Sequence, residues 1–334
     1  MPPAATPSAS AGAVDPPATA VAPARETDLQ KLVNEAHLKF RALTEGANAD
    51  YIPELARIPS ELYGVAIVTV DGRAYVAGDV EYAFSIQSVS KPFTAALVMQ
   101  QRGAEALQKQ IGVEPTGFPF NAIEAIALQP QRSGNPLVNA GAIAAVSMVE
   151  APDAEAKYRL IEGWYGDFAG QKLTMLSEIY KSEAATNRGN RAIAALLAKY
   201  GRIYADPVES VDVYTRQCAI GVNARQLAVM GATLANGGVN PLTGKRVLDS
   251  THVPKLLAIM TMAGFYDESG LWAYRAGLPA KTGVGGGIVA VVPGRMAIVG
   301  FSPRLNQAGN SIRATRAIEY IAGELGVSVF GAGR

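Results

Sequence analysis

The position of the strand signals, which lie only near the two ends of the chain, constrains the fold most. Toward the start, residues 62–70 have the composition of a buried strand, and the turn signal Asp71-Gly72 joins them to a second strand over residues 74–77. Toward the end, residues 287–292 and 295–301 are also rich in β-forming residues. We therefore expect an α+β fold in which both ends build one antiparallel sheet flanked by helices.

The middle of the chain has a different pattern. From about Lys91 to Gly264, runs rich in Ala and Leu alternate with short Gly, Pro and Asn breaks, which predicts helices joined by short loops. The helices expected here cover residues 92–102, 121–128, 139–149, 154–165, 173–185, 190–200, 207–217, 223–236 and 251–263. Two more are expected outside the middle, over residues 27–44 and 311–325.

These patterns predict two domains. Residues 25–90 and 265–334 would form a discontinuous α/β sheet domain, and residues 91–264 would form a helical domain inserted into it. The cleft between the two would be the natural ligand site. Residues 1–24 contain 9 Ala, 6 Pro and no Lys or Arg, which predicts a disordered arm. A cleaved targeting segment remains an alternative for this arm, but the broken apolar pattern favours a cytoplasmic protein.

Composition excludes several classes of function. Lys and Arg number 30 against 29 Asp and Glu, which argues against a general nucleic-acid binder or a protein held to a membrane by charge. No run approaches the roughly 18 apolar residues of a membrane span. With Cys218 as the one cysteine and with His37 and His252 as the two histidines, neither a disulfide framework nor a Cys/His zinc centre is expected. Counting alone leaves a carboxylate-rich Mg²⁺ or Ca²⁺ site open.

The first motif that could carry chemistry is Ser88-Val89-Ser90-Lys91. On a helical turn, a spacing of three places Ser88 and Lys91 on one face, which would set a lysine base beside a serine nucleophile. The motif alone is weak, because a helix start with a capping serine has the same appearance. Free lysine, with a pKa of about 10.4, is also a poor base at pH 7. Burial or a second cation such as Lys281 would have to lower its pKa.

A second motif strengthens this interpretation. Lys281-Thr282-Gly283 precedes a Gly-rich strand, and S-x-x-K combined with K-T-G is typical of penicillin-interacting serine enzymes. The third motif of that set, S-D-N, has no clean match: Ser133-Gly134-Asn135 has the form S-x-N but is typical of an ordinary loop. A Ser-His-Asp triad is not expected, since His37 and His252 both lie in unpromising positions.

Longer stretches around these motifs resemble the serine-dependent glutaminase family, which has a β-lactamase-like fold. The matching stretches are residues 51–56 (YIPELA), 87–92 (QSVSKP), 135–143 (NPLVNAGAI), 234–241 (LANGGVNP), 277–288 (GLPAKTGVGGGI) and 309–311 (GNS). They occur in order between about residues 28 and 325. The resemblance implies hydrolysis of L-glutamine to L-glutamate and ammonia, without a metal or cofactor, by a homo-oligomer that is a dimer or a tetramer.

The resemblance also assigns roles residue by residue. Ser88 corresponds to the nucleophile and Lys91 to the residue that activates it, and the N–H of Val284 would complete an oxyanion hole with that of Ser88. Tyr214 would pass a proton to the leaving ammonia, although which of Lys91 and Tyr214 takes the first proton stays open. The other positions that match substrate-holding residues of the family are Tyr51, Asn139, Glu183, Asn190 and Tyr266.

The chemistry of these side chains suits free glutamine. Glu183 could pair with the α-ammonium group, while Asn139, Asn190 and Tyr51 could hydrogen-bond the α-carboxylate and its surroundings. Tyr266 could close the site over the substrate. Without the resemblance, simpler roles are open: Asn139 and Asn190 as helix caps, Glu183 on a solvated helix face, and the tyrosines as packing residues.

The sequence departs from the family pattern at two places. Where the family has Arg-Asn, this chain reads Arg188-Gly189-Asn190, which makes the assignment of Asn190 with Glu183 the least secure. Where the family has Cys-Ser, this chain reads Cys218-Ala219, so a hydroxyl that could support Tyr214 is missing. Two rival functions remain: another acyl-transfer enzyme of the same fold, such as a β-lactamase or an esterase, and a non-enzymatic binding module.

Overall fold

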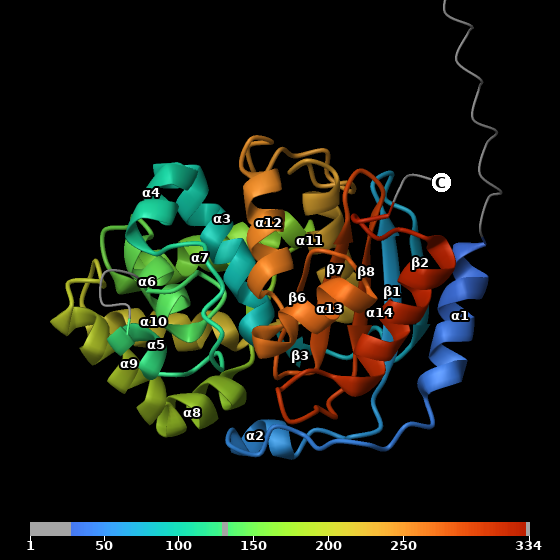
Figure 1. Ribbon diagram of the computed structural model, residues 1–334, viewed down its shortest axis with the longest axis horizontal. Coiled ribbons are helices and arrows are strands. Elements are labelled where there is room, and N and C mark those ends of the chain that lie inside the picture. Colours follow the sequence, from blue (N-terminus) through green and yellow to red (C-terminus); the bar gives the residue numbers. More distant parts are fainter. Residues whose placement is uncertain (1–27, 129–132, 332–334) are drawn as a thin grey trace, which may run out of the picture.

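The computed structural model describes residues 28–128 and 133–331. The Ala/Pro-rich arm predicted for residues 1–24 lies outside them. The chain builds a sheet covered by helices on one side of the molecule and a group of helices on the other side, and the two parts are in contact (Figure 1).

The main sheet is antiparallel and has five strands in the order β2-β1-β8-β7-β6. Its strands are β1 (Gly64–Thr69), β2 (Ala74–Gly78), β6 (Ala280–Thr282), β7 (Gly287–Val292) and β8 (Met296–Phe301). The seam between the two chain ends is the pairing of β1 with β8, in which Ile67 lies opposite Ile298. The prediction that both ends share one antiparallel sheet is confirmed.

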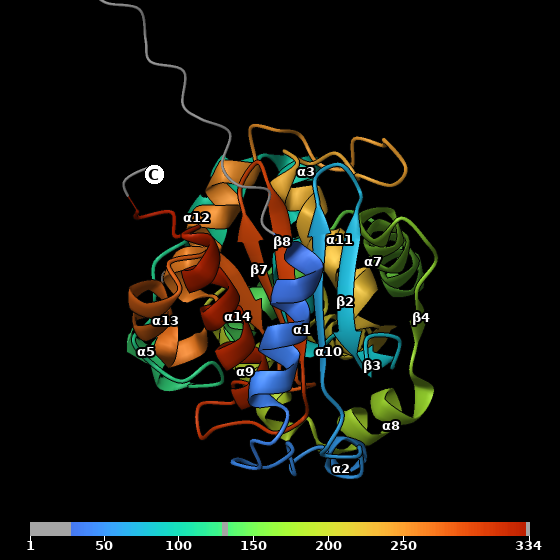
Figure 2. The same ribbon diagram turned by 90° about the vertical axis from the view of Figure 1, so that its right-hand side faces the viewer.

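Both faces of this sheet are covered, which explains why β1 is an unbroken apolar run. Helices α1 (Leu29–Phe40) and α14 (Ile312–Leu325) lie over one face, and α11 (Ala224–Ala235) lies over the other (Figure 2). Alternate β1 residues therefore enter different apolar clusters: Val65 and Ile67 pack with α1 and α14, and Ala66 and Val68 pack with α11. Strands buried on both faces lose the alternation of polar and apolar residues.

The helices of the middle follow the predicted order. They are α3 (Lys91–Arg102), α5 (Glu124–Leu128), α6 (Asn139–Met148), α7 (Ala154–Ala169), α8 (Ser177–Thr186), α9 (Arg188–Lys199), α10 (Pro207–Cys218), α11 and α12 (Val253–Ala263). Three short helices were not predicted: α2 (Pro53–Ala56), α4 (Ala104–Gln110) and α13 (Ser269–Arg275). Each has seven residues or fewer, which is too short to show a clear helical period.

The expectation that strands occur only at the two ends was wrong. A second antiparallel sheet has the order β3-β5-β4, and two of its strands, β4 (Thr174–Met175) and β5 (Ile220–Val222), belong to the middle of the chain. The third strand, β3 (Phe84–Ser85), leads directly into the turn that contains Ser88. Strands of two or three residues carry no readable alternation, and their partners are distant in sequence. This small sheet fixes the start of the Ser88 turn.

Candidate active site

Ser88 lies on a strained turn that connects β3 to α3. The turn is a 3₁₀ helix, η1 (Gln87–Ser90), and Gln87 adopts a φ of 46°, a conformation that side chains other than glycine rarely take. Neither η1 nor α3 has a side-chain cap, so the simpler role of a capping serine is not supported. Strain of this kind is concentrated at functional sites because surrounding contacts must hold it in place.

Glycines bring a second turn directly against η1. A Cβ atom on Gly283 would lie 3.1 Å from Val89 N, and one on Gly285 would lie only 2.3 Å from Ser85 O. The turn after β6 therefore approaches the Ser88 turn at backbone distance. Val284, between these two glycines, is therefore held beside this part of the chain.

Lys91 is completely buried at the first position of α3, and its Nζ donates to Asn139 Oδ1 at 2.6 Å. The hydroxyl of Tyr214 donates to the same oxygen at 3.2 Å, and Asn139 Nδ2 donates to Asn190 Oδ1 at 2.9 Å. Four of the predicted site residues thus form one hydrogen-bonded network. Asn139 is the first residue of α6 rather than its cap, so its side chain is available to this network.

Burial gives Lys91 the properties of a base. It lowers the pKa of Lys91 to about 8, although the nearby Cys218 and Glu183 raise it. The sequence suggested that Lys281 could help, but burial is the cause found. Instead, the charge of Lys91 acts on Lys281. Burial lowers the pKa of Lys281 well below its usual value, and the nearby charge of Lys91 lowers it further. Lys281 Nζ donates to the carbonyls of Thr282 at 2.7 Å and Gly264 at 3.1 Å.

The Tyr266 hydroxyl donates to the carbonyl of Thr282 at 3.4 Å, in the K-T-G motif. Burial raises the pKa of Tyr266, and a side-chain hydrogen bond with Ser88 offsets part of that rise. Tyr266 is also the second non-glycine residue with a positive φ among residues 28–128 and 133–331, at 56°. Its ring packs on Phe120, with centroids 4.5 Å apart, and Lys281 Nζ lies 4.2 Å from its centroid. Tyr266 therefore lies close to both Ser88 and Lys281.

Glu183 is buried on α8, so a role on a solvated helix face is excluded. Its Oε2 accepts a hydrogen bond from Gln87 Nε2 at 3.0 Å. Burial raises the pKa of Glu183 to about 7, although Gln87 and Lys91 lower it. Gln87 is a site residue that the sequence reasoning missed. The available signal was its place immediately before Ser88 in the matching QSVSKP stretch.

An open cleft of about 790 Å³ has two of the predicted site residues in its lining. Its lining includes Tyr51 and Val284, together with Phe120, Leu305, Asn306 and Gly309. Tyr51 lies at the rim with 53% of its side-chain surface exposed. A Cβ on Gly309 would lie 3.5 Å from both Tyr266 Cε2 and Val284 Cγ1, which places this wall of the cleft beside the serine.

Other residues singled out in the sequence are structural. Asn135 is fully buried, donates to Glu114 O at 2.9 Å and accepts from Leu137 N at 2.9 Å, so the S-x-N segment is the ordinary loop that was expected. His37 stacks on Tyr63, with ring centroids 4.8 Å apart. Cys218 is a buried free thiol, and burial raises its pKa.

Within the described residues, no group of three or more His, Cys, Asp or Glu side chains could hold a metal ion. In the same part of the chain, every helix is too short or too polar to span a bilayer.

Comparison with known proteins assigns the class. A family model described as Glutaminase matches residues 46–330. A Glutaminase from Colwellia psychrerythraea is 52% identical over 302 residues, covering 90% of this chain and 97% of the relative. A Glutaminase 1 from Escherichia coli O157:H7 is 50% identical, again covering 90% of this chain and 97% of the relative.

Solved structures agree. One described as a probable glutaminase has a TM-score of 0.90 and 49% identity, covering 91% of this chain and 98% of that one. A probable glutaminase from Bacillus subtilis, in complex with 6-diazo-5-oxo-L-norleucine, has a TM-score of 0.80 and 28% identity, covering 90% and 95%. The chain therefore belongs to the glutaminase family. The prediction that it is an enzyme of this class, an amidohydrolase, is confirmed.

Proposed function

We propose that this protein hydrolyses the side-chain amide of L-glutamine to L-glutamate and ammonia through an acyl-enzyme on Ser88, activated by Lys91. The observation that carries this proposal is the fully buried Lys91, whose pKa falls to about 8 one helical turn from Ser88. A lysine so close to neutrality can accept the serine proton in a useful fraction of molecules at physiological pH.

In the first half-reaction, Ser88 Oγ attacks the amide carbon while its proton passes to Lys91, directly or through the Tyr266 hydroxyl that hydrogen-bonds Ser88. The backbone N–H groups of Ser88 and Val284 would stabilise the negative oxygen of the tetrahedral intermediate. The C–N bond then breaks, and the leaving nitrogen takes back a proton from Lys91 or from Tyr214, which shares Asn139 Oδ1 with Lys91. The products of this step are ammonia and the Ser88 ester.

In the second half-reaction, water attacks the ester carbonyl and gives its proton to Lys91. Collapse of the second tetrahedral intermediate breaks the bond to Ser88 Oγ, which regains the proton, and L-glutamate is released. The same base and the same oxyanion donors act in both steps, and no cofactor or metal is needed.

The substrate's charges fit the groups around the serine. We assign Glu183 to the α-ammonium group, because a buried carboxylate gains most from a cationic partner. Asn190, Asn139 and Tyr51 would hydrogen-bond the α-carboxylate and its surroundings, and Tyr266 would cover the bound amide. Gln87, which donates to Glu183, would hold that carboxylate in position.

The wider organisation of the protein is part of the same proposal. We assign a β-lactamase-like fold with a sheet domain over residues 25–90 and 265–334 and a helical domain over residues 91–264. The protein would act in the cytoplasm as a dimer or a tetramer, with no nucleic-acid or membrane partner.

Ammonia release from L-glutamine by the wild type and by Ser88→Ala tests the proposal, with L-asparagine and D-glutamine as controls. We expect activity in the wild type that disappears in the variant. A folded wild type that releases no ammonia would contradict the glutaminase assignment. Turnover of nitrocefin or of an ester without turnover of glutamine would favour the rival acyl-transfer enzyme.

A further inference from the structure

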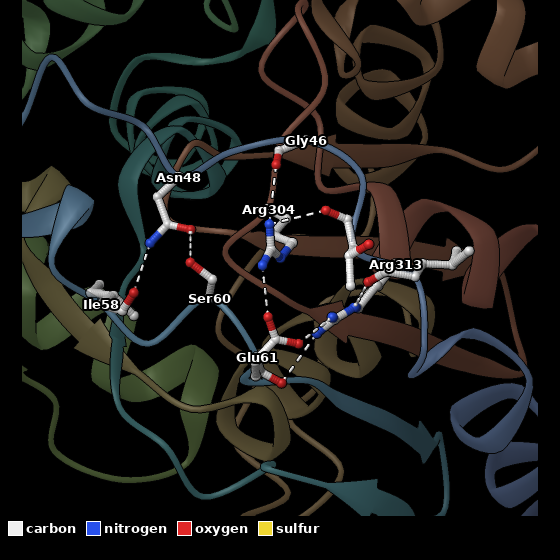
Figure 3. Close-up of polar contacts among 9 residues, drawn as sticks. Gly46, Asn48, Ile58, Ser60, Glu61, Arg304 and Arg313 are labelled. Carbon is white, nitrogen blue, oxygen red and sulfur yellow. Dashed lines mark hydrogen bonds and ion pairs between the residues drawn. The ribbon is translucent and has the colours of Figure 1, made fainter.

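Glu61 joins two arginines beside the segment that carries Tyr51 (Figure 3). Its two carboxylate oxygens accept different partners: Oε1 accepts from Arg304 NH2 and Oε2 from Arg313 NH2, each at 2.7 Å. Arg313 is only 1% exposed, so one of the two guanidinium groups is buried. Hydrogen bonds between ionised groups are stronger than neutral ones, and two together fix the orientation of the carboxylate.

The same arginines also hold the backbone of the segment, residues 43–61. Arg313 Nε donates to Leu43 O at 2.7 Å and Arg313 NH1 donates to Glu61 O at 3.1 Å, so this side chain binds both ends of the segment. Arg304 NH1 donates to the carbonyls of Thr44 at 3.0 Å and Gly46 at 3.3 Å. We call Glu61, Arg304 and Arg313 the clamp.

Within the segment, Asn48 is an internal brace. Its Nδ2 donates to Ile58 O at 2.7 Å, and its Oδ1 accepts from Ser60 Oγ at 3.0 Å (Figure 3). The same Nδ2 also donates to Leu55 O at 3.2 Å. Tyr51 lies inside the loop that this brace closes. The segment is also attached to a second part of the cleft lining, because Ala47 pairs with Leu305.

The Tyr51 side chain is only partly enclosed: burial raises the pKa of its hydroxyl, yet much of the residue is exposed. It is 53% exposed at the rim of the cleft, so its position depends on the backbone on either side. The clamp and the brace supply that backbone order together with the buried side chains of Ala49, Ile52 and Leu55. If the segment were loose, substrate binding would have to order it, and that entropy cost would weaken affinity.

We propose that Glu61 is a positioning residue for substrate binding: through Arg304 and Arg313 it holds residues 43–61 so that Tyr51 stands over the cleft before the substrate arrives. This inference rests on the proposed function for its effect on glutamine, but the ordering of the segment can be measured without turnover. The serine, its lysine and the oxyanion turn lie on η1, α3 and the turn after β6. Loss of the clamp should therefore affect KM more than kcat.

The test compares Glu61→Gln with Glu81→Gln. Glu81 is a matched control: its side chain is 65% exposed against 66% for Glu61, and it also accepts from two side chains, Asn223 and Arg225. We expect Glu61→Gln to raise KM for glutamine about 3- to 10-fold with kcat within about twofold, and Glu81→Gln to leave both unchanged. If Glu61→Gln fails to fold, Arg304→Lys replaces it, because an ammonium group cannot span Glu61 and the backbone carbonyls together.

A double-mutant cycle with Tyr51→Ala separates positioning from a general structural effect. If the clamp acts through Tyr51, the KM of Glu61→Gln combined with Tyr51→Ala should equal that of Tyr51→Ala alone. A KM increase of the same factor whether or not Tyr51 is present would overturn the proposal. So would an unchanged KM in Glu61→Gln.

Hydrogen exchange gives the readout that does not depend on activity. Backbone amides of residues 44–58 should exchange about tenfold faster in Glu61→Gln than in the wild type or in Glu81→Gln. Unchanged exchange would overturn the clamp even in an active enzyme. If amide exchange is faster in Glu61→Gln but the folded wild type releases no ammonia, the clamp is upheld and the proposed function is contradicted.

Discussion

The two sides of Ser88 are built in opposite ways. On the helical side, Lys91, Asn139, Tyr214 and Asn190 meet through side-chain hydrogen bonds. On the sheet side, the site depends on missing side chains: Gly283 and Gly285 let the turn after β6 reach η1. The helical side should therefore be sensitive to removal of a functional group, and the sheet side to addition of one.

The largest effect is expected for Lys91→Met, which keeps the volume but removes the amine. We expect kcat to fall about 10³-fold or more, because a general base contributes 10²–10⁴-fold and Asn139 Oδ1 loses one of its two donors. Steady-state ammonia release measures this loss. Lys157→Met is the matched control, since Lys157 is also buried but donates to Ser147 O in another part of the protein. Equal losses of kcat in the two variants would mean that removing any buried lysine lowers activity, which would contradict a specific role of Lys91 as the base.

Gly285→Ala tests the sheet side. The added Cβ would lie 2.3 Å from Ser85 O, so the turn must move away from η1 and carry the Val284 N–H with it. We expect kcat to fall about 100-fold, as on loss of one oxyanion donor worth about 3 kcal/mol. Gly323→Ala in α14, whose Cβ meets nothing within 4 Å, should keep full activity. Wild-type kcat in Gly285→Ala would show that the close approach of the two turns is unnecessary.

The pH profile compares the two buried charges on the helical side. Lys91 must lose its proton to act as a base, and with a pKa of about 8 its active fraction rises with pH. Between pH 7 and pH 8 we expect loss of the Lys91 proton alone to raise kcat/KM roughly fivefold. Glu183, with its pKa raised to about 7, must also ionise to bind the ammonium group, which steepens the profile below pH 7. In Glu183→Gln, the part of the kcat/KM profile that reflects ionisation near pH 7 should disappear, while the part near pH 8 remains. A kcat/KM that falls with rising pH in this range would exclude Lys91 as the base.

The sheet was predictable from local patterns, and the small strands were not. The β1 and β2 pair is joined by Asp71-Gly72, so its signals lie within one short stretch of sequence. In contrast, Phe84 of β3 pairs with Val222 of β5, across most of the helical middle. Pairings between such distant strands depend on tertiary packing, and the spacing of apolar residues within a short stretch of sequence cannot reveal them.

The site residues also differ in whether local sequence patterns could predict them. The spacing of Ser88 and Lys91 could be read directly, whereas the contact of Lys91 with Asn139 joins residues 48 positions apart, and the resemblance to the family had to supply it. Gln87 was missed because its positive φ and its bond to Glu183 exist only in the folded chain. The cause of the lowered Lys91 pKa could not be read either, since burial is a property of the whole core.

The most direct test of the central claim asks which atom becomes covalently bound. The wild type and Ser88→Ala would be incubated with 6-diazo-5-oxo-L-norleucine, the compound bound in the Bacillus subtilis relative, and then mapped by peptide mass spectrometry. A glutamine-like electrophile should modify Ser88 in the wild type, excess L-glutamine should protect it, and Ser88→Ala should stay unmodified. Modification of Cys218 in place of Ser88, or an unmodified wild type that still releases ammonia from glutamine, would contradict the Ser88 acyl-enzyme.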